Sequence, residues 1–369
     1  MRTCNSYPLI LALLLVCFAI PAVAQPVNDG YLFDQGVAYT ERSPRAPEAL
    51  DKMKDLLGQW DIQVTTFTPD AEPRVSAGMA EVTYMIRGYA YMSRVHVPAY
   101  DGEHELNLLQ FINYSPSHEA WVLGEANSYT EHIAMYNGEL KGRKLSLTSA
   151  IRKGGTPVLT HIKIEYAMHS SDSFSVTRSQ KTSRDADWAK TEKHEYSRRE
   201  HTAAFMQPRK DTGNPSKNRP AASSQFDFLL GEWQAIHNMN VGGQQIQFPV
   251  NATAVHAMNG HAILEHSWFD LDPSLPDAAT SIIRLYNRAM RRWESLYLTN
   301  RGNSQLFFGG RQEGDQIVLH NFEANTTDAV MARYVFHDIA GDTYAWYGEN
   351  STDRGQTFNT FWDIAFTKK

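Results

Sequence analysis

The sequence predicts an all-β protein made of two tandem antiparallel barrels, with a short helix before the first strand of each. Aromatic residues make up 11% of the chain, and such side chains favour strands. Short alternating segments recur between turn signals, which is typical of a barrel or sandwich and not of a parallel α/β sheet. The string Leu56-Leu57-Gly58-Gln59-Trp60 returns as Leu229-Leu230-Gly231-Glu232-Trp233, and each copy opens one half of the chain.

The first 24 residues have the pattern of a secretory signal peptide. Arg2 precedes an apolar run that begins at Leu9, and Ala22-Val23-Ala24 is a small-x-small cleavage site. The apolar run is shorter than the ~20 residues that a membrane-spanning helix needs. Both cysteines, Cys4 and Cys17, lie in this segment, so no disulfide, cysteine-based metal site or cysteine nucleophile is expected after cleavage. We therefore expect a periplasmic or secreted protein without stable membrane insertion after signal cleavage.

The charge balance argues against nucleic acid as a partner. The chain carries 35 basic and 41 acidic residues, a net charge of −6, and has no basic run. The expected partner is instead a small apolar or amphipathic ligand.

The chain divides into five predicted segments. A helix is expected before Gly58 because Leu50, Met53 and Leu57 share a face and Pro47 suits a first helical turn. A stretch rich in proline, glycine and asparagine separates the two halves. The segments are a signal peptide over residues 1–24, a flexible arm over 25–45, a first barrel over 46–201, a linker over 202–224 and a second barrel over 225–369.

Turn and aromatic positions recur between the two halves at a nearly fixed offset. Arg87-Gly88 corresponds to Asn259-Gly260, the strongest hairpin signal in the chain. Tyr114 and Trp121 correspond to Tyr286 and Trp293 with the same spacing. The two halves are therefore expected to share one barrel design.

A Gly-x-Trp sequence at the start of a barrel of about 150 residues resembles the calycin group, which includes lipocalins, fatty-acid-binding proteins and nitrobindins. The second half resembles the bacterial DUF1579 family in Gly260-His261-Ala262-Ile263-Leu264-Glu265, Tyr286-Asn287 with Trp293, Arg333, Tyr344-Ala345-Trp346 and the turn over 351–358. The resemblance covers most of 225–369 and, in weaker form, 46–201. It implies a lipocalin-like fold with Trp60 and Trp233 as barrel plugs, and it implies no reaction.

The second barrel is the predicted binding unit, because the first has Glu165 and Val176 where the second has Arg333 and Trp346. An arginine on an apolar inner wall must bind a ligand carboxylate or meet a glutamate such as Glu265. An acidic ligand is therefore one alternative, and a barrel filled by its own aromatic side chains is another. The predicted ligand-binding residues are Arg284, Arg333, Trp346, Glu265, Tyr286 and Tyr297.

Other chemistries receive less support from the sequence. His256, His261 and His266 share a hairpin but are not expected to converge, so no metal is predicted. Haem would need a histidine near the last strand; His194 stands there only in the first half, and no cofactor is expected. An alternative function is a small-molecule isomerase, cyclase or hydrolase with Glu265 or His266 as general base.

Two further features are interpreted as structural. Glu81 and Arg94 are expected to form a cross-strand ion pair. The stretch over 351–358 resembles the Asp-box turn of sialidases, in which Asp and Ser side chains bond the amides of a turn.

Overall fold

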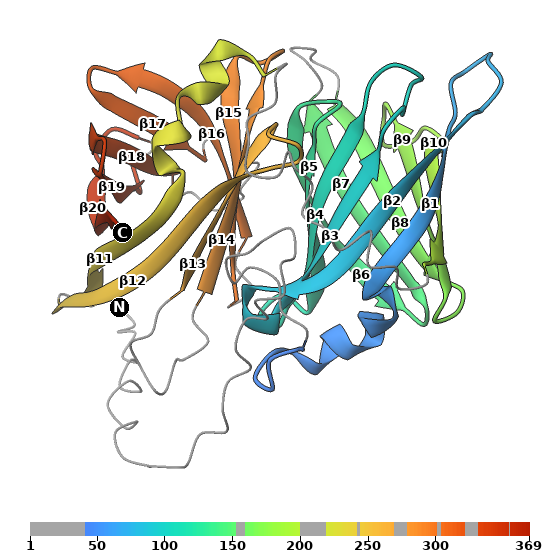
Figure 1. Cartoon of the computed structure of the whole chain (residues 1–369), viewed down its shortest axis with the longest axis horizontal. Coiled ribbons are helices and arrows are strands. Elements are labelled where there is room, and N and C mark those ends of the chain that lie inside the picture. The colour runs from blue at the N-terminus through green and yellow to red at the C-terminus, as the bar shows by residue number, and fades with distance from the viewer. Residues whose placement is uncertain are drawn as a thin grey trace, which may run out of the picture.

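A computed structural model of the chain describes residues 41–152, 159–199, 219–241, 244–268, 279–300, 304–321, 331–353 and 355–369. The described residues form two closed barrels of ten antiparallel strands each, β1 to β10 and β11 to β20 (Figure 1). Neighbours in sequence pair with each other, and the last strand of each barrel pairs with the first. The predicted all-β tandem-barrel fold is confirmed. The signal peptide and most of the predicted arm and linker lie outside the described residues.

Among the described residues, no helix combines the length and the apolar character needed to cross a membrane.

The first barrel begins with a nine-residue 3-10 helix and continues as an antiparallel meander. Its elements are η1 (Glu48–Leu56), β1 (Gly58–Thr66), β2 (Arg74–Met85), η2 (Ile86–Gly88), β3 (Ala90–Val97), β4 (Leu106–Ser115), β5 (Ala120–Asn127), β6 (His132–Lys141), β7 (Lys144–Arg152), β8 (Leu159–Met168), β9 (Ser173–Lys181) and β10 (Ala189–Arg198).

The second barrel repeats this order after two short 3-10 helices. Its elements are η3 (Ala221–Ser224), η4 (Asp227–Leu229), β11 (Gly231–Val241), β12 (Gln244–Ala257), β13 (Ala262–Trp268), β14 (Ala279–Asn287), β15 (Arg292–Thr299), β16 (Ser304–Glu313), β17 (Gln316–His320), β18 (Met331–Ala340), β19 (Thr343–Ser351) and β20 (Asn359–Lys368). The helix η3 lies within the segment that the sequence assigned to the linker.

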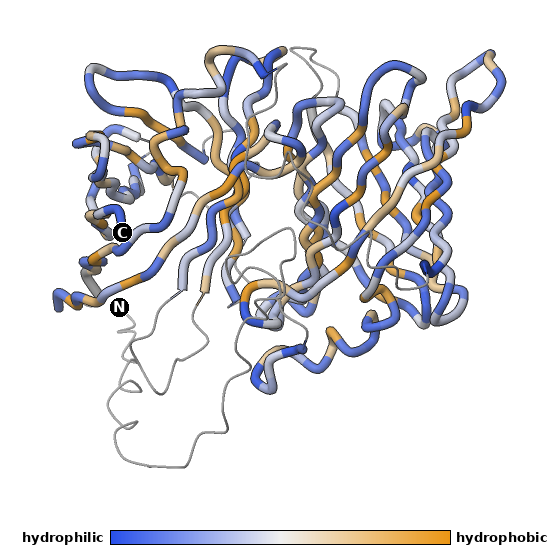
Figure 2. The backbone as a smooth tube through the Cα atoms, viewed as in Figure 1, coloured by the Kyte–Doolittle hydropathy of each residue, from blue (hydrophilic) through white to orange (hydrophobic). Residues whose placement is uncertain are grey.

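Alternation along the strands builds the interior of each barrel. In β1 the side chains of Trp60, Ile62 and Val64 are buried inside the barrel, whereas Asp61 and Gln63 between them are exposed. Figure 2 shows the same alternation of apolar and polar residues along strands of both barrels. A two-residue period therefore determines which side chains can meet inside the barrels.

Each barrel is closed at one end by its repeated tryptophan. The Trp60 indole nitrogen donates to the Leu56 carbonyl at 2.9 Å, and Trp233 donates in the same way to Leu229 at 2.7 Å. The Trp60 ring meets Phe174 edge-on at 4.7 Å, and Trp233 meets Tyr344 at 4.8 Å. The two plugs are thus built alike.

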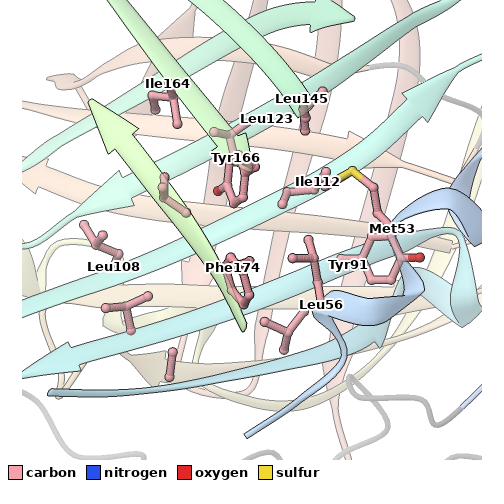
Figure 3. Close-up of a cluster of buried hydrophobic side chains, with 14 of the residues drawn as sticks. Met53, Leu56, Tyr91, Leu108, Ile112, Leu123, Leu145, Ile164, Tyr166 and Phe174 are labelled. Atoms are coloured by element: carbon pink, nitrogen blue, oxygen red, sulfur yellow. The ribbon is translucent and has the colours of Figure 1, made fainter. Parts of the chain in front are cut away.

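Side chains of η1 complete the first plug. Figure 3 shows Met53 and Leu56 of this helix pointing into the cluster that contains Tyr91 and Phe174. All four side chains are buried. The helix is therefore a lid on the closed end of the barrel and not a separate layer.

The predicted register of the second hairpin is confirmed. Ala254 pairs with Glu265 and His256 with Ile263, around a turn in which Asn259 and Gly260 have φ of 54° and 82°. Glycine tolerates this left-handed backbone at no steric cost. In the first hairpin, Glu81 pairs with Arg94, and their side chains form the expected ion pair.

The two barrels join through the outer faces of their central strands, which lie side by side in Figure 1. Gly124 of β5 lies so close to Leu296 of β15 that a Cβ at Gly124 would stand 2.1 Å from Leu296 Cδ2. The two barrels share a single cluster of buried apolar side chains, so the contact between them is a hydrophobic core. The cluster contains Met85, Ile86, Ala90, Met92, Leu109, Phe111, Ala126 and Ile133 of the first barrel and Ala257, Ala262, Leu264, Ala279, Ile283, Leu285, Leu296 and Leu298 of the second.

Candidate functional site

The charged pair on the inner wall of the second barrel is fully engaged. Arg284 Nη1 donates to Glu265 Oε2 at 2.6 Å, and the two residues are 2% and 4% exposed. The guanidinium also lies over the rings of Phe226 and Phe336, at 5.8 and 5.7 Å from their centroids. Of the two roles that the sequence allowed for Arg284, the structure shows pairing with a glutamate. Its charge is therefore already balanced inside the protein.

Arg333 lies on the opposite side of the sheet from Arg284. Its neighbour Tyr334 packs inside the second barrel, so strand alternation turns Arg333 outward. There Arg333 Nε donates to Glu349 Oε2 at 2.5 Å, and the guanidinium stacks over the Phe358 ring at 3.9 Å. The structure therefore does not bring Arg333 together with the other residues of the predicted site.

The stretch that follows Glu349 forms the expected structural turn. The Asp353 carboxylate accepts hydrogen bonds from the backbone amides of Gln356 and Thr357 at 3.0 and 2.9 Å. Ser351 Oγ accepts from the amide of Gly355 at 2.8 Å. These bonds hold the pKa of Asp353 below its usual value, with the Thr357 hydroxyl as the largest contributor. The turn therefore organises the β19–β20 connection beneath Arg333.

The predicted aromatic residues of the second barrel divide between its two ends. Tyr286 lies beside Trp293, with ring centroids 5.7 Å apart, in the cluster that includes the Trp233 plug. Tyr297 and Trp346 also face the interior. Trp346 contacts Trp362, at 5.2 Å between ring centroids. Tyr297 stands four residues beyond Trp293 on β15, so it lies further from the Trp233 end of the barrel than Tyr286 does.

This second group surrounds the end of the barrel that lies away from Trp233, and we call it the aromatic collar. Four of its side chains keep part of their surface exposed although they face inward, whereas His237 and Trp346 are buried. The collar consists of His237, Phe248, Tyr297, Tyr334, Trp346 and Trp362.

A neutral histidine is held within the collar. The Trp362 indole nitrogen donates to His237 Nδ1 at 3.2 Å. Burial lowers the pKa of His237 to about 3, so the ring is uncharged and can accept this bond. His237 also lies 5.1 Å from the Phe248 ring. The collar therefore presents aromatic surface without a formal charge.

The two candidate general bases of the enzyme alternative are both occupied. His266 faces away from the barrel interior, and its Nδ1 lies 2.9 Å from Ser281 Oγ in the contact between the barrels. Burial, assisted by the positive charge of Arg87, lowers the pKa of His266 to about 4. Glu265 is bound by Arg284. Neither group is placed to take a proton from a ligand in the collar.

The three histidines of the second hairpin do not meet. His256 faces inward beside Ile263, His266 faces outward, and His261 lies 3.4 Å from Glu105 of the first barrel. Within the described ranges, no three histidine, aspartate, glutamate or cysteine side chains gather as metal ligands would.

The first barrel contains a buried ionic network that was not predicted from the sequence. Arg178 Nη2 donates to Glu125 Oε1 at 2.5 Å, and its Nε lies 3.4 Å from Glu192 Oε2. Glu192 also lies 3.1 Å from His194 Nε2 and accepts a hydrogen bond from the Tyr100 hydroxyl. Burial opposes the charge on Glu192, but His194 and then Arg178 outweigh it and lower the pKa to about 2.

The spacing of residues along β9 and β10 indicates which members of this network face the barrel interior. Arg178 stands two and four residues after Val176 and Phe174, and His194 stands two residues before Tyr196. Because side chains two apart share a face, Arg178 and His194 fall on the inner face with those core residues. The missing information was that closure of the barrel brings β9 opposite β5.

Residues 47–198, which extend from η1 to the end of β10, match a family described as a protein of unknown function, DUF1579. The matched residues span the first barrel. The sequence resemblance to this family was drawn mainly from the second half, whereas the match falls on the first. The Arg178 network therefore lies within the matched residues, and the family description names no activity.

Solved structures give only weak likenesses to the chain. A protein of unknown function from the DUF3598 family of Nostoc punctiforme is 9% identical over 88% of this chain and 100% of its own, with a TM-score of 0.24. A candidate AttH protein of Nitrosomonas europaea is 9% identical over 89% of this chain and 99% of its own, with a TM-score of 0.13. Scores this low do not establish a shared fold. No curated protein matches the sequence.

Proposed function

We propose that the protein binds a small, uncharged, apolar or amphipathic molecule in the aromatic collar of the second barrel. The observation that carries this proposal is the partial exposure of Phe248, Tyr297, Tyr334 and Trp362, although all four face inward. Aromatic surface left open inside a barrel is stabilised when an apolar ligand covers it. The signal peptide predicted over 1–24 supports a role in the periplasm or outside the cell.

The lack of available charge argues for an uncharged ligand. Arg284 is 2% exposed and bound to Glu265, and Arg333 lies on the outer face with Glu349. A carboxylate in the collar would lose its hydration without gaining a cation from either arginine. The acidic ligand considered from the sequence is therefore the less favoured alternative.

The two remaining alternatives, an enzyme and a purely structural barrel, make different demands on the second barrel. An enzyme using Glu265 or His266 would first have to break the Arg284 pair or the contact between the barrels. A purely structural barrel would need no ligand, and the partly open aromatic side chains would be core at the edge of the fold. Direct measurement of binding separates this last possibility from the proposal.

The first experiment is native mass spectrometry of the mature protein purified from its own compartment. A co-purified molecule that dissociates on mild activation would identify the ligand. A complementary titration uses the neutral fluorescent probe N-phenyl-1-naphthylamine. Trp362→Ala should weaken probe binding at least about tenfold, equivalent to ~1.4 kcal/mol.

Trp188→Ala provides the matched control for this titration. Trp188 lies between the amines of Lys163 and Lys181, which are 5.1 and 5.0 Å from its ring, in the first barrel and away from the collar. Its removal should leave probe affinity unchanged. Equal affinity of the Trp362→Ala and Trp188→Ala proteins, at the same folded fraction, would show that the collar is not the binding site.

A further inference from the structure

We propose that the first barrel holds a second binding site, in which Arg178 donates hydrogen bonds to an uncharged oxygen acceptor, such as the carbonyl of an ester or ketone. This site is independent of the aromatic collar and differs from it in chemistry. It rests on the position, the remaining exposure and the charge environment of Arg178.

The Arg178 side chain crosses the interior of the barrel. It starts on β9 and reaches Glu125 on β5, and these strands are not neighbours in the barrel. Its Nη1 donates to the Tyr136 hydroxyl on β6 at 3.2 Å. Gln110 on β4 extends the layer by donating to Glu125 Oε2 at 2.7 Å. These side chains form a polar layer across the barrel.

Apolar side chains lie on both sides of the polar layer. Trp60, Phe174 and Tyr196 fill the closed end, where the Phe174 and Tyr196 rings stack at 4.0 Å. Val97 and Leu106, which flank the β3–β4 connection at the other end, are also buried in the core. A molecule that reached Arg178 would therefore meet hydrocarbon walls around a single polar layer.

Arg178 keeps donor capacity, and part of its side chain remains accessible. Its side chain is 19% exposed, whereas the side chains of Glu125 and His194 are 3% and 5% exposed. A guanidinium has five N–H donors. Among the described residues, Glu125, Glu192 and Tyr136 account for one contact each at Nη2, Nε and Nη1. One N–H on each terminal nitrogen thus remains for a ligand oxygen.

The neighbouring carboxylates select against an anion. Glu125 and Glu192 both contact Arg178, and Glu192 also lies 3.1 Å from His194, so the positive groups of the layer already have carboxylate partners. A ligand carboxylate beside Arg178 would meet two negative charges in a poorly solvated interior, where like charges repel strongly. An ester or ketone oxygen can accept the same N–H groups without that repulsion. The charge arrangement therefore favours a neutral acceptor over an acid of the same length.

Tyr100 lies on the other side of the layer. Its hydroxyl donates to Glu192, and its carbonyl accepts from Ser76 Oγ at 3.0 Å. Its ring meets Tyr129 edge-on at 4.9 Å. Because Tyr100 belongs to the connection between β3 and β4, it covers Glu192 from the end of the barrel that is opposite the Trp60 plug.

The test compares methyl decanoate with decanoate, which share an acyl chain, by calorimetric titration at about pH 7.5. The full mature chain carries Trp362→Ala, which weakens binding at the collar. We expect the ester to bind at least tenfold more tightly than the carboxylate. Equal or tighter binding of decanoate would overturn the proposal, and so would the failure of both probes to bind.

A charge variant then tests the cause of the preference. Glu192→Gln keeps a side chain that can hydrogen-bond to Tyr100 and removes one of the two negative charges beside Arg178. The ratio of decanoate to ester dissociation constants should therefore fall at least tenfold. Glu139→Gln, at a side chain that is 64% exposed on β6, is the matched control and should leave the preference unchanged. An unchanged preference in a folded Glu192→Gln protein would refute the charge argument.

A second variant keeps the test decisive if Glu192→Gln does not fold. Arg178→Lys retains the positive charge but loses the planar fork of donors. We expect it to lose most ester affinity while preserving the far-ultraviolet spectrum of the barrel. Undiminished ester binding by a folded Arg178→Lys protein would show that the acceptor is not held by this arginine.

Discussion

Gly124 of the first barrel and Leu296 of the second touch across the contact between the barrels, and a Cβ at Gly124 would lie 2.1 Å from Leu296 Cδ2. Polar contacts flank this apolar centre. Glu294 of β15 accepts from the Ile133 amide at 2.7 Å and lies 2.6 Å from His132 Nδ1. The repeat is therefore arranged as an internal dimer whose two halves share one core, and each half should depend on the other for stability.

Gly124→Val tests this dependence. The added side chain must displace Leu296, and overpacking of this kind costs about 1–3 kcal/mol of unfolding free energy. The Gly124→Val, Leu296→Ala double variant should recover part of the loss, because the second change makes room for the first. Chemical unfolding of the two single variants and the double variant measures the coupling.

Gly341→Val is the matched control for this cycle, since no other atom lies within 4 Å of a Cβ at that position. It should change stability much less than Gly124→Val. Strict additivity of the Gly124 and Leu296 substitutions would contradict close contact between the barrels.

Acid should destabilise the protein through two neutral buried histidines. The pKa of His237 is lowered to about 3 and that of His266 to about 4, from an ordinary value of 6.5. Between those folded values and 6.5, the unfolded chain binds protons that the folded chain does not, so stability is full above about pH 6.5 and falls as the pH decreases. Near pH 5 the loss is about 2 kcal/mol for each histidine.

Unfolding free energies at about pH 7.5 and pH 5 measure this loss. His266→Gln should have a shallower pH dependence than the wild type, even if it is less stable at neutral pH. His104→Gln is the control, because the side chain of His104 is 68% exposed. The same pH slope in the wild type and His266→Gln proteins would rule out a buried neutral ring at His266.

The pairing of strands could be predicted from the sequence wherever a turn fixed the register. Asn259-Gly260 sets Ala254 opposite Glu265, and the same register places His266 on the outer face. The equivalent buried positions of Trp60 and Trp233 were also predictable, because the same short string opens each first strand. Local sequence therefore specified the hairpins and the closed ends of the barrels.

The faces of some central strands could not be predicted in the same way. Ile282 faces the second barrel's interior, whereas Ile283 lies in the contact between the barrels, so β14 is apolar on both sides. An alternating pattern cannot reveal a buried outer face when both faces are apolar. The contact between the barrels, with His266 inside it, consequently had no clear local signal.

The Arg178 network illustrates a second limit. Glu125 and Arg178 are far apart in the sequence and stand on strands that do not pair. Only closure of the barrel brings them together, and no local pattern specifies that distance. Arg333 shows the opposite limit. The sequence predicted it as a ligand-binding residue inside the barrel, but it stands next to the inward-facing Tyr334 and therefore points outward.

The two arginines of the predicted site should respond very differently to substitution. Arg284→Ala leaves the Glu265 carboxylate buried without its partner, and breaking such a pair costs about 3–5 kcal/mol. Arg333→Ala removes a partly exposed pair with Glu349, which should cost under ~1 kcal/mol. Thermal unfolding of both variants, with probe binding measured on the folded proteins, checks this difference.

The Arg284→Met, Glu265→Leu double variant separates the loss of charge pairing from the loss of packing. Replacing both members of a buried pair by apolar groups is often nearly neutral, so we expect it to be more stable than Arg284→Ala. Because the pair lies outside the aromatic collar, binding of the neutral probe should survive in both the double variant and Arg333→Ala. If Arg333→Ala instead abolished binding while the double variant retained it, the ligand would have to lie against the outer face around Glu349 and Phe358, and the collar would be excluded.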